Sequence, residues 1–202
     1  ATGDGLSLGV DATGAILHCQ IDGRDLLRPD ARGGFFLADV GAPPGPDLEV
    51  LDNGSFERLG TDQPVDWQSG PEWTVDRQIA HTGTASMRVC IPGPDKRSSA
   101  SLSREVAVRP DTPYQVTMWV RTEGGTPHLY VEQLDAGGRQ HPDYPQLTVS
   151  HSRSRSDWFQ LNTQFTTAPF CRRIRVRTNL WQQTGTAWID DVSLVCLEDD
   201  CL

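Results

Sequence analysis

The chain has 202 residues, of which 37% are hydrophobic and 22% charged, and its formal net charge at pH 7 is −9. This length and composition are typical of a globular protein that can bury a sizeable core, and they exclude a disordered chain. The acidic balance argues against nucleic acid as a partner, because a phosphate backbone attracts basic proteins. No apolar run reaches the length that a membrane span needs, so we expect no membrane partner.

The first 47 residues carry the signals of a small β-structure. The runs at residues 6–10 and 15–21 resemble strands, and a third such run follows at residues 35–40. Residues 41–47 are rich in Gly and Pro and form the clearest linker in the chain. The segment therefore predicts an N-terminal β-extension over residues 1–47. Either it adds strands to the domain that follows, or it is part of a neighbouring domain.

Residues 48–202 contain a series of short strand-like runs separated by Gly and Pro turns. The predicted strands cover residues 87–91, 101–108, 114–122, 128–134, 158–166, 173–178 and 188–195. We find no segment of useful length with a helical period. This pattern predicts an all-β domain, an antiparallel β-sandwich of the jelly-roll type.

One predicted strand, residues 114–121, has two clearly different faces. Alternation buries one set of its side chains and places Gln115, Trp119 and Arg121 on the polar side. A tryptophan there is suited to sugar binding, since the C–H face of a sugar ring packs on a flat aromatic ring. The alternative is that the N-terminal segment covers Trp119.

Other candidates for sugar binding follow along the chain. Tyr130 and Glu132 share a face of the next predicted strand and are the second choice, and Arg175 and Trp181 come after them. Arg175 belongs to a row of alternating arginines, and such a row is most often a solvated outer face. If it lies on the binding sheet instead, it would suit uronate-bearing or sulfated glycans, because guanidinium groups bind carboxylates in a forked geometry.

Two acidic residues far apart in the sequence are candidates for a metal site. Asp190 opens the half-buried end of the last strand, and Glu57 ends the motif at residues 53–57. If the first and last strands of the sandwich lie side by side, the two carboxylates converge and repel one another. A bound calcium ion, with backbone carbonyls, would relieve this repulsion. The alternative is that both are surface acids.

Several motifs occur in the order found in a known family. They are residues 53–57, Trp67, residues 80–89, residues 110–121, Trp158 with Phe165, and residues 189–194. In this order the chain resembles, from about Glu49 to Val195, the calcium-containing jelly-roll carbohydrate-binding modules of families four, nine and twenty-two, which have a galactose-binding-like fold.

The resemblance implies a concave sheet that binds extended polysaccharide and a structural calcium ion away from it. By position, Glu57 and Asp190 would be side-chain calcium ligands, and backbone carbonyls near Ser55 and in the turn at residues 81–84 would complete the shell. Trp119 falls where such modules often place a sugar-stacking aromatic.

We therefore expect a secreted, monomeric and non-catalytic module that binds a β-linked polysaccharide and keeps a linked enzyme or surface near it. One alternative is a glycosidase or polysaccharide lyase that acts by itself, although no stretch suggests a catalytic carboxylate pair. The other is a structural or protein-interaction sandwich.

The five cysteines bear on the location and on the redox state. They are Cys19, Cys90, Cys171, Cys196 and Cys201, and they form no CxxC pair. One or two disulfides would suit a secreted protein. The alternative is that Cys19 and Cys90 fill core positions as free thiols.

Overall fold

The computed structural model describes residues 6–10, 16–21, 24–25, 49–61, 63–93, 101–151 and 154–198, and side chains from residue 49 onward. The chain divides into two compact units, Ala1–Pro43 and Pro44–Leu202. In the first unit, β1 (Leu6–Val10), β2 (Ile16–Ile21) and β3 (Arg24–Asp25) form an antiparallel sheet of their own. The strand predicted at residues 35–40 and the predicted linker at 41–47 lie outside the described residues.

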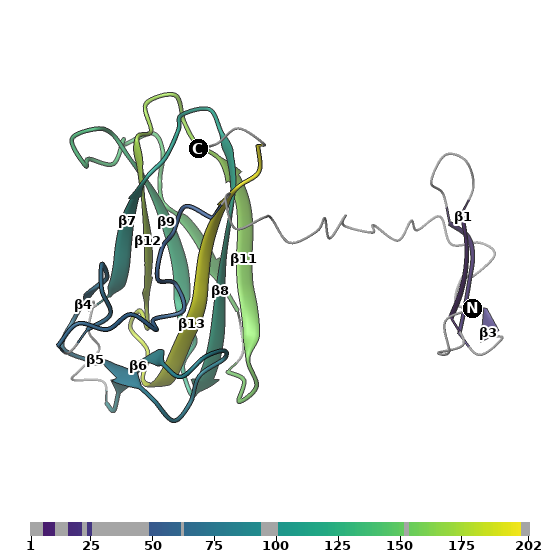
Figure 1. Ribbon diagram of the computed structural model, residues 1–202, viewed down its shortest axis with the longest axis horizontal. Coiled ribbons are helices and arrows are strands. Elements are labelled where there is room, and N and C mark those ends of the chain that lie inside the picture. The colour runs from purple at the N-terminus through teal and green to yellow at the C-terminus, as the bar shows by residue number, and fades with distance from the viewer. Residues whose placement is uncertain are drawn as a thin grey trace. The chain divides into compact units, whose positions relative to one another are not determined.

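The second unit is a sandwich of two five-stranded antiparallel sheets (Figure 1). Sheet I has the order β10-β9-β12-β7-β4, formed by Leu147–Ser150, His128–Leu134, Arg173–Asn179, Leu102–Ala107 and Gln68–Ser69. Sheet II has the order β11-β8-β13-β6-β5, formed by Phe159–Thr166, Pro113–Glu123, Gly185–Cys196, Ser86–Ile91 and Trp73–Asp76. The prediction of an all-β antiparallel sandwich is confirmed.

The core lies between the two sheets and follows the alternation expected from the sequence. Met118 and Val120 of β8 are fully buried, and from the facing sheet so is Ile174 of β12, with Val176 only 2% exposed. These residues belong to one continuous hydrophobic cluster. Because β8 and β12 each bury one side, their other side chains form the outer faces of the sandwich.

The connection from β8 to β9 carries the chain from sheet II to sheet I. Gly124 and Gly125 make this turn with φ angles of 73° and 72°, and a Cβ on Gly125 would lie 2.7 Å from the Thr184 carbonyl oxygen. Such a left-handed turn next to another backbone requires glycine. The expectation that Tyr130 and Glu132 lie beside the Trp119 strand is therefore wrong, because β8 and β9 belong to different sheets.

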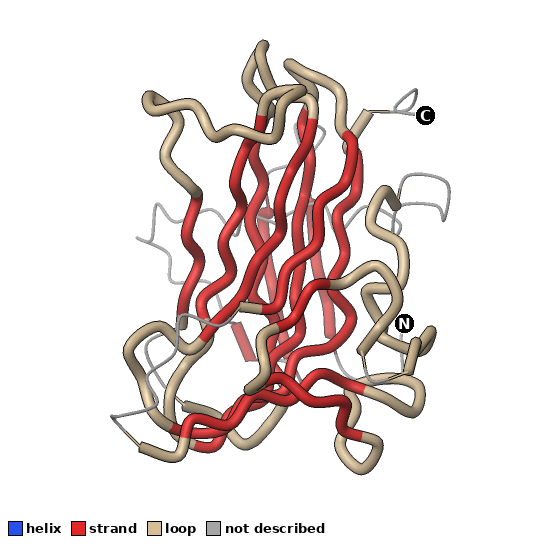
Figure 2. The backbone as a smooth tube through the Cα atoms, turned by 90° about the vertical axis from the view of Figure 1, so that its left-hand side faces the viewer, coloured by secondary structure: helices blue, strands red, loops and turns tan. Residues whose placement is uncertain are grey.

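Three short strands of the sandwich were not predicted. β4 and β5 lie at the edges of the two sheets, and β10 falls within the polar segment 141–155, which resembles a loop in the sequence. β10 pairs with β9 from Leu147 opposite Val131 onward. The strands run along most of the sandwich, and most loops lie at its two ends (Figure 2).

The segment before β4 lies against the last strand, β13. The Val50 N–H donates to the Leu194 carbonyl oxygen at 2.8 Å, and the Val192 N–H donates to the Gly54 carbonyl oxygen at 3.0 Å. A Cβ on Gly54 would lie 1.6 Å from the Val192 oxygen, so only glycine allows this approach. The first and last parts of the module are thus side by side.

Candidate functional site

The outer face of sheet I carries a network of charged and aromatic side chains, which we call the polar face. Its members are Glu105 on β7, Tyr130 and Glu132 on β9, and Arg175 and Arg177 on β12. The strand register places Arg175 between Glu105 and Glu132, and Arg177 opposite Tyr130. Three neighbouring strands therefore bring these side chains together.

The carboxylate of Glu132 bridges two arginines. Arg175 Nη1 donates to Glu132 Oε2 at 2.8 Å, and Arg177 Nε donates to Glu132 Oε1 at 2.9 Å. Arg175 Nε also donates to Glu105 Oε1 at 2.8 Å. Glu132 is only 7% exposed, whereas the arginine side chains remain 33% and 21% exposed. The carboxylate thus holds the two guanidinium planes in fixed positions at the surface.

Tyr130 extends the polar face beside this network. The Arg177 guanidinium lies 4.3 Å from the centre of its ring, and the hydroxyl is 2.9 Å from His128 Nδ1. Burial raises the pKa of the Tyr130 hydroxyl and lowers the pKa of His128, so both groups are held neutral near pH 7. Tyr130 is only 5% exposed beneath Arg177, so the polar face presents its guanidinium groups and not the tyrosine ring.

The first-choice candidates lie on the opposite outer face, that of sheet II, and have protein partners there. His81 stacks on Trp119 with 4.0 Å between ring centres. Gln115 accepts a hydrogen bond from Gln164 at 3.2 Å. The Arg121 guanidinium lies 5.4 Å from the centre of the Trp188 ring. The structure thus gives Trp119 a packing partner that the sequence does not indicate, because a histidine from the β5–β6 loop covers one face of its ring.

Trp188 is the buried centre of this second face, although it points away from the core of the sandwich. It is 4% exposed, and its Nε1 donates to Asp76 Oδ2 at 2.8 Å. Arg88 lies near its ring at 5.8 Å, in addition to Arg121. The part of the sheet II outer face around Trp188 is thus filled by the protein's own side chains.

Glu57 and Asp190, the predicted metal ligands, bind the same turn at residues 81–85. Glu57 Oε1 accepts hydrogen bonds from the N–H groups of Thr84 at 2.8 Å and Ala85 at 3.0 Å. Asp190 Oδ2 accepts one from the N–H of His81 at 2.7 Å. The two carboxylates therefore hold opposite ends of one turn.

Asp190 is fully buried, and burial raises its pKa to about 6, helped by the neighbouring charge of Asp191. A buried carboxylate of this kind gains from a nearby cation. Within the described residues, no three His, Cys, Asp or Glu side chains are grouped as metal ligands would be. The donor set thus fits a calcium ion only if backbone carbonyls supply much of the shell, and Ser55 lies in the turn before Glu57.

Trp181 lies apart from both groups of candidates. It is in the turn between β12 and β13, and it is 47% exposed.

Sequence reasoning missed Glu49, whose carboxylate accepts hydrogen bonds from the N–H groups of Leu51 at 2.9 Å and Leu194 at 2.8 Å. Burial raises the pKa of Glu49. Its role is to join the start of the module to β13.

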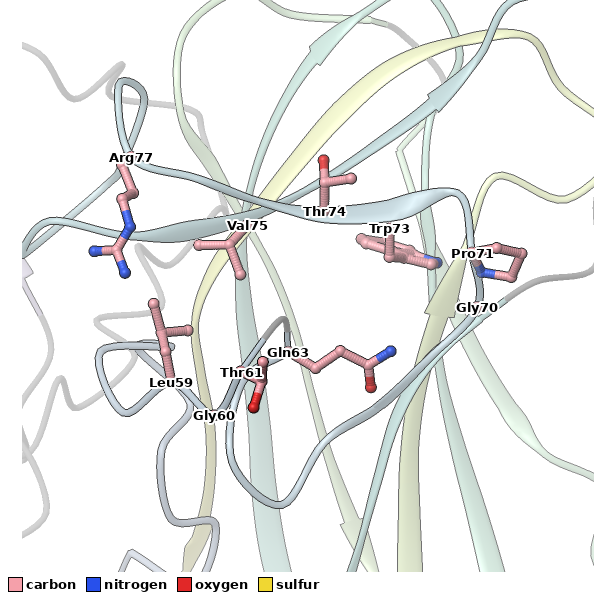
Figure 3. A pocket seen from close by; sticks show the side chains of 10 residues that line it. All are labelled: Leu59, Gly60, Thr61, Gln63, Gly70, Pro71, Trp73, Thr74, Val75 and Arg77. Atoms are coloured by element: carbon pink, nitrogen blue, oxygen red, sulfur yellow. The ribbon is translucent and has the colours of Figure 1, made fainter.

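A pocket of about 480 Å³ lies between the loop at residues 59–63 and edge strand β5 (Figure 3). Leu59 and Val75 face one another across it, with Arg77 at one end and Trp73 at the other. None of the residues predicted to bind sugar or metal lines this pocket.

Comparisons with known proteins concern the second unit. Residues 48–186 match the family described as "Carbohydrate binding domain". Exochitinase 1 of Streptomyces olivaceoviridis is 30% identical over 149 residues, which are 74% of this chain and 22% of that relative. The chain therefore spans 22% of the length of this curated relative.

Solved structures share the fold at low identity. The CBM22-1 xylan-binding domain of Paenibacillus barcinonensis Xyn10C has a TM-score of 0.55 and 16% identity, over 72% of this chain and 92% of that domain. The enzymatically active domain of bacteriophage CBA120 tailspike protein 4 has a TM-score of 0.62 and 13% identity, over 75% of this chain and 22% of that chain. At these identities the likeness concerns the fold alone.

Proposed function

We propose that this chain, which belongs to the carbohydrate binding domain family, holds an extended polysaccharide on the polar face of sheet I. Modules of this family are non-catalytic accessory domains, so the chain binds polysaccharide and does not cleave it. The independent glycosidase or lyase considered above is therefore set aside. What remains to be proposed is the face, the kind of glycan and the setting.

The observation that carries the choice of face is the bridge from Glu132 to Arg175 and Arg177. Sugar hydroxyls need hydrogen-bond partners that are fixed in direction, and their C–H faces need a flat apolar surface. The polar face offers two guanidinium planes that a shared carboxylate holds in place and whose side chains remain 33% and 21% exposed. On the sheet II face, Arg88 and Arg121 lie near the ring of Trp188 instead.

The charge of the polar face favours a glycan that carries some acidic groups. Arg173 joins the row through Glu105, with Arg173 Nη1 donating to Glu105 Oε2 at 3.3 Å. Three guanidinium groups thus face two carboxylates, which leaves a surplus of positive charge. Uronate-substituted β-linked chains would use this surplus through forked hydrogen bonds. We accordingly propose a β-linked polysaccharide, and the names of the exochitinase relative and the xylan-binding structure support the choice of glycans to test.

We also propose a structural calcium ion near the turn at residues 81–85, with Glu57 and Asp190 as its side-chain ligands. The buried charge of Asp190 supports it, because a cation would offset the cost of keeping that carboxylate ionised. Calcium would fix the turn against β13, on the side of the sandwich away from the polar face. Its role is then stability, not sugar contact.

The setting we propose is extracellular, as a monomer linked to an enzyme or a cell surface. The relative is an exochitinase much longer than this chain, which supports an accessory role.

We further propose that Cys196, unlike the free thiols Cys90 and Cys171, takes part in a disulfide. Counting alkylated cysteines before and after reduction by mass spectrometry tests this proposal, and an equal count would exclude it.

The experiment that tests the choice of face is retention on a panel of immobilised polysaccharides that includes chitin, neutral xylan and glucuronate-substituted xylan. The Arg175→Ala variant should lose most of the retention shown by the parent chain. Arg121→Ala is the matched control, since it removes an arginine from the outer face of sheet II. Equal retention by Arg175→Ala and the parent would exclude the polar face as the site.

A further inference from the structure

Three aromatic rings meet at the end of sheet I where β9 ends and β12 begins. His141 stacks on Phe170 with 4.9 Å between ring centres, and Tyr144 meets Phe170 edge-on at 5.0 Å. His141 and Tyr144 also contact one another at 5.7 Å. We call these three residues the aromatic cluster.

The aromatic cluster is built on a bulge in the β9–β10 hairpin. Leu134 pairs with Gln140, but the regular pairing resumes only with Leu147 opposite Val131. Six residues, 141–146, therefore face only residues 132 and 133 of the other arm of the hairpin. In Figure 1 the loop between β9 and β10 extends outward from the end of β9.

A hydrogen bond joins this loop to the polar face. Gln146, the last residue of the bulge, accepts a hydrogen bond at its Oε1 from Arg177 Nη2 at 2.7 Å. At the other side of the cluster, Phe170 lies three residues before Arg173, the end of the arginine row. The aromatic cluster thus continues the polar face beyond the end of the strands.

The cluster leaves apolar surface exposed next to a polar network. Phe170 packs against the core, and this explains its own position. Tyr144, in contrast, is 41% exposed, and Leu147 beside the bulge is 37% exposed. A hollow of about 310 Å³ adjoins the aromatic cluster, lined by Asp135, Arg139, Gln140, His141, Pro142 and Phe170. An exposed ring beside a largely apolar hollow with a few polar groups is suited to binding a ligand.

We propose that the aromatic cluster is a further sugar subsite, where a ring of the same polysaccharide packs on Tyr144 after the chain leaves the polar face. This inference rests on the proposed function and adds the direction in which the glycan extends. Tyr144 offers the apolar ring, and Gln140 and Arg139 offer hydrogen-bond donors and acceptors to the hydroxyls. Affinity should then increase with chain length until the cluster is filled.

The test is calorimetry with a series of oligosaccharides of increasing length, made from whichever polysaccharide the parent chain retains. The parent should bind the longer members more tightly. Tyr144→Ala should bind the short members as the parent does and lose roughly five- to tenfold for the long ones. Tyr144→Phe keeps the ring and should behave as the parent. Urea denaturation of each variant checks that the fold is unchanged.

Two further outcomes separate this inference from the proposed function. If Tyr144→Ala binds all lengths as the parent does while Arg175→Ala binds all of them weakly, the subsite is wrong and the polar face stands. If Arg175→Ala binds as the parent does, the polar face itself is wrong, and the subsite fails with it.

Discussion

The two outer faces of the sandwich carry similar kinds of side chains in different arrangements. Each has a central strand with alternating polar residues, an aromatic ring and at least one arginine. On sheet II, Trp119 is stacked by His81, and Trp188 is flanked by arginines and bonded to Asp76. On sheet I, Glu132 fixes two arginines whose side chains remain partly exposed.

The difference bears on which of the two faces can take up a ligand. An aromatic side chain on an outer face is available to a ligand only if no loop of the same protein covers it. The β5–β6 loop supplies His81 to sheet II, whereas the β9–β10 loop leaves Tyr144 exposed beside sheet I. The predictions below test this contrast, beginning with the largest expected effect.

Removing the buried tryptophan of sheet II should cost the most stability. Trp188→Ala takes away a ring that is 4% exposed, so we expect the free energy of unfolding to fall by about 3–5 kcal/mol. Urea denaturation measures the change. Trp181→Ala is the matched control, because that ring is 47% exposed and its loss should change stability by less than about 0.5 kcal/mol. Similar losses for both variants would show that the sheet II face is not filled as described.

Calcium should stabilise the folded state by fixing the turn at residues 81–85 beside sheet II. At a free concentration 100 times its dissociation constant, a single ion adds about 2.7 kcal/mol to the folded state, and chelation should therefore lower Tm by several degrees. Glu57→Ala should abolish the difference between chelated and calcium-loaded protein. Identical melting curves for the parent with and without chelator would contradict the calcium proposal.

The bridging carboxylate of sheet I should matter for binding. Glu132→Gln keeps the shape of the side chain but weakens the charge-assisted bonds that position Arg175 and Arg177. We expect the affinity for glycan to fall by about tenfold, equivalent to about 1.4 kcal/mol. Calorimetry on the retained polysaccharide measures it, and an unchanged affinity would show that the positions of the arginines do not matter.

The smallest effect is expected from replacing Gln115, on the outer face of sheet II. The Gln115 side chain accepts a hydrogen bond from Gln164 at the surface, so Gln115→Ala should change neither stability nor affinity by more than about 0.5 kcal/mol. The same two measurements apply. A clear loss of glycan binding here would reverse the assignment of the two faces.

Much of the fold could be predicted from the sequence, because alternation and turn residues act locally. The strand at residues 114–122 and the burial of its inner side chains follow directly from the pattern, as does the strand at 128–134. The two-residue β4 was not predictable in this way, since too few positions alternate.

The arrangement of the site was harder to predict. Gly124 and Gly125 indicate a turn, but a turn does not reveal that the chain crosses to the other sheet. The contact of His81 with Trp119 joins residues 38 positions apart, and no local pattern encodes it. From the sequence, residue type alone ranks the sugar-binding candidates. Whether a glycan can reach them depends on which loops cover them in the fold.

The most direct test of this account compares Arg175→Ala with Trp119→Ala by calorimetry on the same polysaccharide, with each variant shown to be folded. The account predicts that Arg175→Ala lowers the affinity by about thirtyfold, as expected when a residue central to binding is lost, and that Trp119→Ala leaves it within a factor of about two. A large loss for Trp119→Ala together with an unchanged affinity for Arg175→Ala would place the glycan on sheet II and contradict the account.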